Sequence, residues 1–313
     1  MIVLRIFFAV LVLFAACTAL VYLCLFRPNI LRSNTPVDDV PEKSEALAQY
    51  LPRLRSCAAW YSGQQREKVY ITSYDGLRLC AEYLPAENPK GTVVCMHGFH
   101  SSALRDFLPV VQFFHDRGWN ILLPSQRSHG ESEGRYLTFG VHERYDCRGW
   151  VAYVNARNGT EQPVALYGVS MGCATVVMSL GLEQPANVRA VVADCGFTSP
   201  YEEMAHVLKD FNHLPVHPVM IFARLLTRVI AGFGLKEYST FDALRINKIP
   251  VLFIHGECDD FVPTEMSRRN YEACRAPKEL LIVKNAKHAV SSILDNAGYE
   301  RKIAAFLAEY AEK

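Results

Sequence analysis

Gly168-Val169-Ser170-Met171-Gly172 decides how the centre of this 313-residue chain folds. The apolar run 164–167 precedes it, and the run 173–182, which is compatible with a helix, follows it. A serine between a strand and a helix lies on a tight turn, where glycines on both sides remove Cβ atoms that would otherwise clash. The pattern therefore predicts that Ser170 stands exposed at the carboxyl edge of a sheet, where a catalytic nucleophile is expected.

Two loops further along the chain carry the partners that a serine nucleophile needs. The apolar run 251–254 leads to Asp259, and the run 280–283 leads to His288. Short apolar runs of this kind predict buried parallel strands, whose ends meet at one edge of a sheet. A serine hydroxyl is a weak nucleophile, so a histidine must take its proton, while an acid holds the imidazole tautomer. The order serine, acid, histidine suits this arrangement.

The motifs together resemble those of serine hydrolases of the α/β-hydrolase superfamily. The similarity runs from about residue 69 to the C-terminus and rests on His-Gly-Phe at 97–99, on 168–172, on 255–263 and on His288. It is greatest to the dienelactone-hydrolase and prolyl-oligopeptidase-like branch, including bacterial members tethered by one N-terminal helix. The resemblance implies an α/β-hydrolase fold and an oxyanion hole made by the backbone N–H groups of Phe99 and Met171.

The branch contains esterases, thioesterases and peptidases, so the resemblance implies the mechanism more than the substrate. We expect a carboxylic ester or thioester hydrolase that forms an acyl-enzyme on Ser170. An amidase or serine peptidase of the same mechanism is one alternative, and a non-catalytic binding protein that keeps the fold is another. Serine, acid, base and oxyanion loop are all present, which argues against the binding protein. We expect a small-molecule or acyl substrate, no cofactor and no metal, because the chain has no C-x-x-C or H-E-x-x-H spacing.

The acid and the base each have competitors. Asp260 is next to Asp259, and Asp194 ends the apolar run 188–193, but the spacing to Val262 and Pro263 matches the family pattern for Asp259. His97 and His255 each precede a glycine at a strand end and are expected to brace loops, while His129 lies in a loop that is not catalytic in the superfamily. His100 lies beside the oxyanion loop and is a possible substrate contact.

Composition and the N-terminal sequence limit which further functions and which location are expected. Half of the residues are hydrophobic and the formal net charge is +1, so the chain has no excess charge for binding nucleic acid. Residues 6–26 are almost continuously apolar over the length that spans a bilayer, which is typical of a transmembrane anchor or a signal sequence. A cleaved signal peptide has a shorter apolar stretch, which favours a retained anchor in 1–26. The proline-bearing segment 27–41 is expected to be a tether. By resemblance to tethered relatives, the catalytic domain is expected outside the cytoplasm.

The alternation of elements predicts the architecture of the domain 42–313. Segments 69–73 and 77–84 flank a turn and predict a hairpin, and apolar strands then alternate with helical segments, which predicts a mostly parallel, doubly wound sheet. The segment 196–248 departs from this alternation and contains the strongly apolar stretch 219–226. It is expected to be a small helical lid or a packing insertion, and contact with a bilayer surface through Arg224 and Arg228 is a third option.

Overall fold

A single eight-stranded sheet forms the centre of the computed structural model, which describes residues 5, 8, 12 and 45–312. The strand order is β1-β2-β4-β3-β5-β6-β7-β8. The first two strands pair antiparallel, and the other strands run parallel to one another. The predicted hairpin and the predicted mostly parallel sheet are therefore confirmed. The strands are β1 Glu67–Thr72, β2 Arg78–Leu84, β3 Gly91–Met96, β4 Trp119–Pro124, β5 Val164–Val169, β6 Val188–Asp194, β7 Val251–Gly256 and β8 Lys278–Val283.

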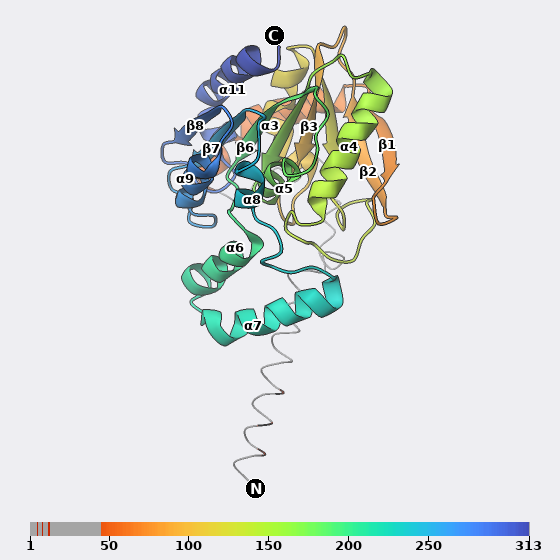
Figure 1. The fold of residues 1–313 in the computed structure, drawn as a ribbon. Coiled ribbons are helices and arrows are strands. Elements are labelled where there is room, and N and C mark those ends of the chain that lie inside the picture. Colours follow the sequence, from red (N-terminus) through yellow and green to blue (C-terminus); the bar gives the residue numbers. More distant parts are fainter. Residues whose placement is uncertain (1–4, 6–7, 9–11, 13–44, 313) are drawn as a thin grey trace.

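Helices cover both faces of this sheet (Figure 1). On one face lie α2 (Leu51–Ser62), α3 (Ala103–His115) and α11 (Asn296–Tyr310), and on the other lie α4 (Glu143–Asn158), α5 (Met171–Ser179) and α8 (Thr240–Leu244). Alternate residues of β3 point into opposite cores: Val93 and Cys95 into the first, Val94 and Met96 into the second. Burial on both faces explains why the central strands are continuous apolar runs rather than alternating ones.

The segment between β6 and β7 divides into two parts. The helices α6 (Pro200–His206) and α7 (Val216–Leu226), with the π-helical turns η3 (Val207–Phe211) and η4 (Thr227–Ala231), lie together beyond the ends of the strands (Figure 1). We call residues 200–231 the cap. The chain then returns to α8, which packs on α5. The predicted insertion 196–248 is thus a projecting cap followed by an ordinary covering helix.

A third hydrophobic cluster joins the cap to the rest of the domain. It contains Met204 and Met220 from the cap and Met171 from the start of α5. The remaining described helices are η2 (Glu45–Tyr50), α9 (Thr264–Ala273) and α10 (Ser291–Leu294). The predicted tether 27–41 lies outside the described residues, as does the predicted anchor 1–26 apart from positions 5, 8 and 12. In the part of the chain that is described, no helix has both the length and the apolar character needed to cross a bilayer.

Candidate active site

Ser170 occupies a strained turn between β5 and α5. Its φ and ψ are 56° and −119°, a backbone region that is costly for any residue with a Cβ atom. A Cβ on Gly168 would lie 2.2 Å from the carbonyl oxygen of Gly172, and a Cβ on Gly172 would lie 1.8 Å from that of Met96. No side chain fits at either distance. The two glycines of the motif are therefore required by close backbone packing, which holds Ser170 at the end of its strand.

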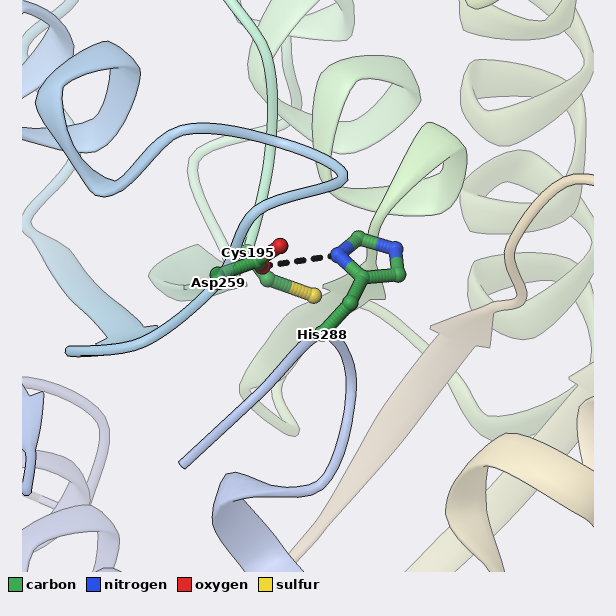
Figure 2. Close-up of side chains that lie close together, drawn as sticks. All are labelled: Cys195, Asp259 and His288. Carbon is green, nitrogen blue, oxygen red and sulfur yellow. Dashed lines mark hydrogen bonds and ion pairs between the residues drawn. The ribbon is translucent and has the colours of Figure 1, made fainter. Parts of the chain in front are cut away.

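The three side chains singled out from the sequence lie in one hydrogen-bonded chain. Ser170 Oγ is 2.9 Å from His288 Nε2, and His288 Nδ1 is 2.7 Å from Asp259 Oδ2. Figure 2 shows the Asp259 carboxylate next to the ring of His288. A carboxylate only accepts, so Nδ1 carries the proton and Nε2 is left to accept the hydroxyl proton of Ser170. This is the geometry in which an imidazole acts as a general base toward a serine.

The Asp259 carboxylate is held in its charged form by four hydrogen bonds. Oδ2 also accepts from His255 Nε2 at 3.0 Å, and Oδ1 accepts from the backbone N–H groups of Phe261 and Val262 at 3.1 and 2.9 Å. Burial alone would raise the pKa of this carboxyl, but the hydrogen bonds from His255 and His288 outweigh it and lower the pKa to about 2. The acid is thus ionised throughout the neutral range.

His255 holds the acid of the site, a role that was not assigned to it from the sequence. Its Nε2 faces two acceptors, Asp259 Oδ2 and the Val262 carbonyl oxygen at 2.9 Å, and must therefore be protonated. Its Nδ1 lies 2.6 Å from Ser267 Oγ, which donates to it. The expectation that His255 braces a loop is met, and the group it braces is the acid itself. A histidine four residues before an aspartate at a strand end was the available signal.

The two competing acids lie elsewhere. Asp194 Oδ2 accepts a hydrogen bond of 2.7 Å from the Tyr299 hydroxyl and makes none with His288, and burial raises its pKa to about 6. Asp260 is exposed, and its carbonyl oxygen accepts a hydrogen bond from His206. Of the three carboxylates considered from the sequence, Asp259 is the one bonded to His288.

The histidines in the loops around 97 and 129 are neutral structural groups. His97 Nδ1 donates to the Gly98 carbonyl oxygen at 2.8 Å, and Nε2 accepts from the backbone N–H of Gln126 at 3.0 Å. Burial lowers the pKa of His97 to about 4 and that of His129, whose ring meets His97 edge-on, to about 3. Neither ring makes a hydrogen bond to Ser170.

The loop that follows β3 passes directly beside Ser170. A Cβ on Gly98 would lie 3.2 Å from Ser170 Cβ, so the next N–H group, that of Phe99, is close to the serine. The half-buried Asp106 holds this loop by accepting from the backbone N–H of Gly98 at 2.6 Å and from Ser101 Oγ at 2.5 Å. Asp106 was not among the site residues predicted from the sequence. Its signal is an acid in the first turn of α3, a position that usually indicates only helix capping.

His100 lies on the same loop in a left-handed conformation, with φ of 49°. Its ring stacks on Phe99 with 3.8 Å between centroids. Burial lowers its pKa, and its Nε2 is buried without a hydrogen-bond partner among the described residues. A buried polar atom without a partner costs free energy, so this nitrogen is available to a group that enters the site.

Aromatic and methionine side chains surround the serine and histidine. The Phe261 ring lies 5.1 Å from that of His288, and Phe99 lies 5.2 Å from Phe139. Phe139 belongs to the same hydrophobic cluster as Met171 and the cap residue Met220. The surroundings of Ser170 and His288 are therefore strongly apolar.

Cys195 lies next to Asp259 and His288 (Figure 2). One donor atom from each of Cys195, Asp259 and His288 falls within 4.8 Å of the others, a spacing that a metal ion could use. Burial raises the pKa of the Cys195 thiol well above its usual value, which disfavours the thiolate that a metal requires. Asp259 and His288 are already paired with each other. The donor set fits serine chemistry better than metal binding.

Comparisons with known proteins agree with this geometry. A family model described as serine aminopeptidase, S33, matches residues 87–245. The chain is 30% identical to the Bacillus subtilis protein YqkD over 79% of this chain and 81% of that protein. It is 25% identical to YfhR of Escherichia coli K12 over 71% of this chain and 73% of that protein.

Solved structures share the fold. The Pyrococcus furiosus esterase Pf2001 superposes with a TM-score of 0.66 at 23% identity, over 79% of this chain and 92% of the esterase chain. An identity this low supports the fold alone. The family match, together with the elbow at Ser170, shows that this chain belongs to the serine aminopeptidase (S33) family of the α/β-hydrolase superfamily of serine hydrolases.

Proposed function

We propose that the protein cleaves carboxylic esters or thioesters through an acyl-enzyme on Ser170. The observation that carries the proposal is the continuous hydrogen-bonded chain from Ser170 Oγ through His288 to the ionised Asp259. An unassisted serine hydroxyl does not attack an ester at neutral pH, and this chain supplies the base that it lacks.

The proposed reaction has two halves. As Ser170 Oγ attacks the acyl carbon, His288 Nε2 takes the hydroxyl proton and then gives it to the departing alcohol or thiol. In the second half, the same nitrogen takes a proton from water while the water oxygen attacks the acyl carbon. The bond from that carbon to Ser170 Oγ then breaks, the carboxylic acid leaves, and the proton returns from His288 to Oγ. Asp259 stays ionised and stabilises the imidazolium in both halves.

The negative charge on the substrate oxygen needs fixed donors, and we assign these to the backbone N–H groups of Phe99 and Met171. No hydrogen bond from either N–H group to a protein acceptor is found in the described ranges. Met171 begins α5, where the helix dipole also favours an anion. Loss of one such donor typically costs on the order of 10²–10³ in turnover. Asp106 then acts as a positioning residue, because it holds the turn that carries Phe99.

The apolar surroundings favour an acyl group of low polarity. Met171, Phe139 and Met220 lie in one hydrophobic cluster with the cap, and Phe99 packs against it. Apolar side chains of this kind stabilise a bound acyl chain by removing its surface from water. Residues 200–231 would then serve as a lid.

We also assign the unpartnered Nε2 of His100 to contact with the substrate. The family description favours a peptidase of the same mechanism as the second candidate.

Two experiments test the proposal. Labelling with a fluorophosphonate probe is expected for the unchanged protein and not for Ser170→Ala, and equal labelling of both would exclude the assigned nucleophile. A panel of p-nitrophenyl esters of increasing chain length, compared with aminoacyl-anilides, is expected to show faster turnover of the esters. Faster turnover of the anilides would indicate that the protein is a peptidase rather than an esterase.

We further infer that residues 6–26 anchor the protein in a membrane with the hydrolase domain outside the cytoplasm. The support is the length of the apolar run and the resemblance to tethered relatives. The membrane fraction should keep the protein after washing with alkaline carbonate, and added protease should digest the domain in cells whose outer barrier is opened. Release by carbonate, or protection from protease, would refute the anchor or the orientation respectively.

A further inference from the structure

The outer face of the cap carries a stripe of exposed apolar side chains. Ile221, Leu225 and Val229 are spaced four residues apart along α7 and η4, so they lie on one side of successive turns. Their exposed fractions are 58%, 59% and 73%. The opposite side of the same segment packs into the domain through Met220 and Thr227. A helix that is apolar on both sides is expected to be buried on both sides.

The same face is positively charged. No acidic residue occurs in 211–236, whereas Arg224, Arg228 and Lys236 all fall within it, in a chain whose net charge is only +1. Arg224 and Arg228 are exposed and line a shallow groove together with Ile221 and Leu225. Glu237 offsets part of this charge by pairing with Arg228 at 2.9 Å. The apolar stripe is thus flanked by cations, and α7 lies at the end of the cap away from the sheet (Figure 1).

The positive charge of this face distinguishes between two partners that could cover it, a second copy of the chain and a lipid surface. A second copy of the chain would bring one basic face against another, and like charges across an interface oppose association. An anionic lipid surface complements both features, because its headgroups attract the arginines while its acyl boundary accepts the apolar stripe.

The N-terminal sequence supports the same occupant. Residues 6–26 have the length and composition of a bilayer-spanning segment. The residues from 27 to 44 reach about 60 Å when fully extended, which is enough to let the cap meet the membrane that holds such an anchor. Anchoring would also raise the local concentration of the cap at that surface, so a weak contact would be populated.

We propose that the outer face of α7 and η4 docks on an anionic membrane surface. Ile221, Leu225 and Val229 enter the boundary between headgroups and acyl chains, and Arg224 and Arg228 lie among the headgroups. The docking does not depend on the proposed esterase activity. It places the cap, and with it the catalytic residues below, at a lipid surface.

Tryptophan scanning of the full-length protein in lipid vesicles tests this proposal. Leu225→Trp reports on the stripe, and Ile246→Trp is the matched control, because Ile246 is also apolar and 63% exposed but lies between α8 and β7, outside the cap. Vesicles of phosphatidylglycerol with brominated acyl chains quench a tryptophan that enters them. The signal of Trp60, Trp119 and Trp150 is subtracted with the unsubstituted protein.

The expected result is loss of about half of the added emission for Leu225→Trp and little loss for Ile246→Trp. The quenching should fall in brominated phosphatidylcholine vesicles and when Arg224→Gln and Arg228→Gln are added. Absence of quenching at 225, or equal quenching at both positions, overturns the proposal. Emission at 225 that shifts with protein concentration without lipid overturns it in favour of a second copy. Hydrolysis is not measured, so failure of the proposed function leaves the result unaffected.

Discussion

Replacing Asp259 with asparagine is expected to invert the imidazole tautomer of His288. The side chain now accepts four hydrogen bonds, two at each oxygen. An asparagine whose oxygen keeps the N–H groups of Phe261 and Val262 turns its NH₂ group toward His288 Nδ1. Since NH₂ is only a donor, Nδ1 must give up its proton, and Nε2 then carries the proton and points it at Ser170 Oγ. The base can no longer accept the serine proton.

The size of the effect follows from this loss of the general base. A wrong tautomer with the geometry intact is expected to lower kcat by about 10³–10⁴, which corresponds to about 4–5.5 kcal/mol in the activation barrier. The assay is the steady-state rate with a p-nitrophenyl ester, and thermal unfolding verifies that Asp259→Asn is folded. Two matched controls are available: Asp260→Asn changes the exposed neighbour, and Asp194→Asn changes a buried carboxyl that is bonded to Tyr299.

Both controls are expected to lose less than about threefold, because neither carboxylate is bonded to His288. If Asp259→Asn keeps more than about a tenth of the activity while Asp194→Asn loses most of it, the acid is Asp194. The reasoning from hydrogen-bond geometry would then be refuted.

Three further predictions concern other parts of the domain. Gly172→Ala should destabilise the protein by more than about 3 kcal/mol in urea unfolding, because its Cβ would lie 1.8 Å from Met96 O, and unchanged stability would contradict the packing described for the elbow. Burial raises the pKa of Glu203 from 4.5 to about 8, so the folded state binds more protons than the unfolded one between these values, and stability should fall by up to about 1.4 kcal/mol per pH unit as pH rises through this window. Unfolding at pH 5 and pH 8 should show a weaker pH dependence for Glu203→Gln, and an identical dependence would mean that Glu203 is not buried in the neutral form. His100→Phe keeps a ring to stack on Phe99 but removes the unpartnered nitrogen, and kcat/KM should fall by about tenfold; an unchanged value would remove His100 from the substrate site.

The elements closest to the nucleophile could be predicted from the sequence because the forces that shape them are local or periodic. The glycine at 168 is required by a contact within the elbow, and the glycine at 172 by a contact with Met96 of the neighbouring strand β3. The central strands are buried on both faces, so each has a continuous apolar sequence, as a parallel sheet that is covered on both faces requires. The serine turn, the strands that precede the site residues and the fold class could be predicted from these two features.

The partners of each side chain were decided only by the tertiary structure. Asp194 is the last residue of β6 and Asp259 follows β7, so the sequence places both at the same end of the sheet. The register of β6 and β7 and the turn after β7 determine that Asp259 meets His288. Asp106 bonds to Gly98 in the loop after β3, and His255 bonds to Asp259. Both hydrogen bonds depend on how these segments fold against each other. A hydrogen bond requires atoms placed within a few tenths of an ångström, and a pattern of apolar and polar residues determines which face a side chain occupies but not that distance.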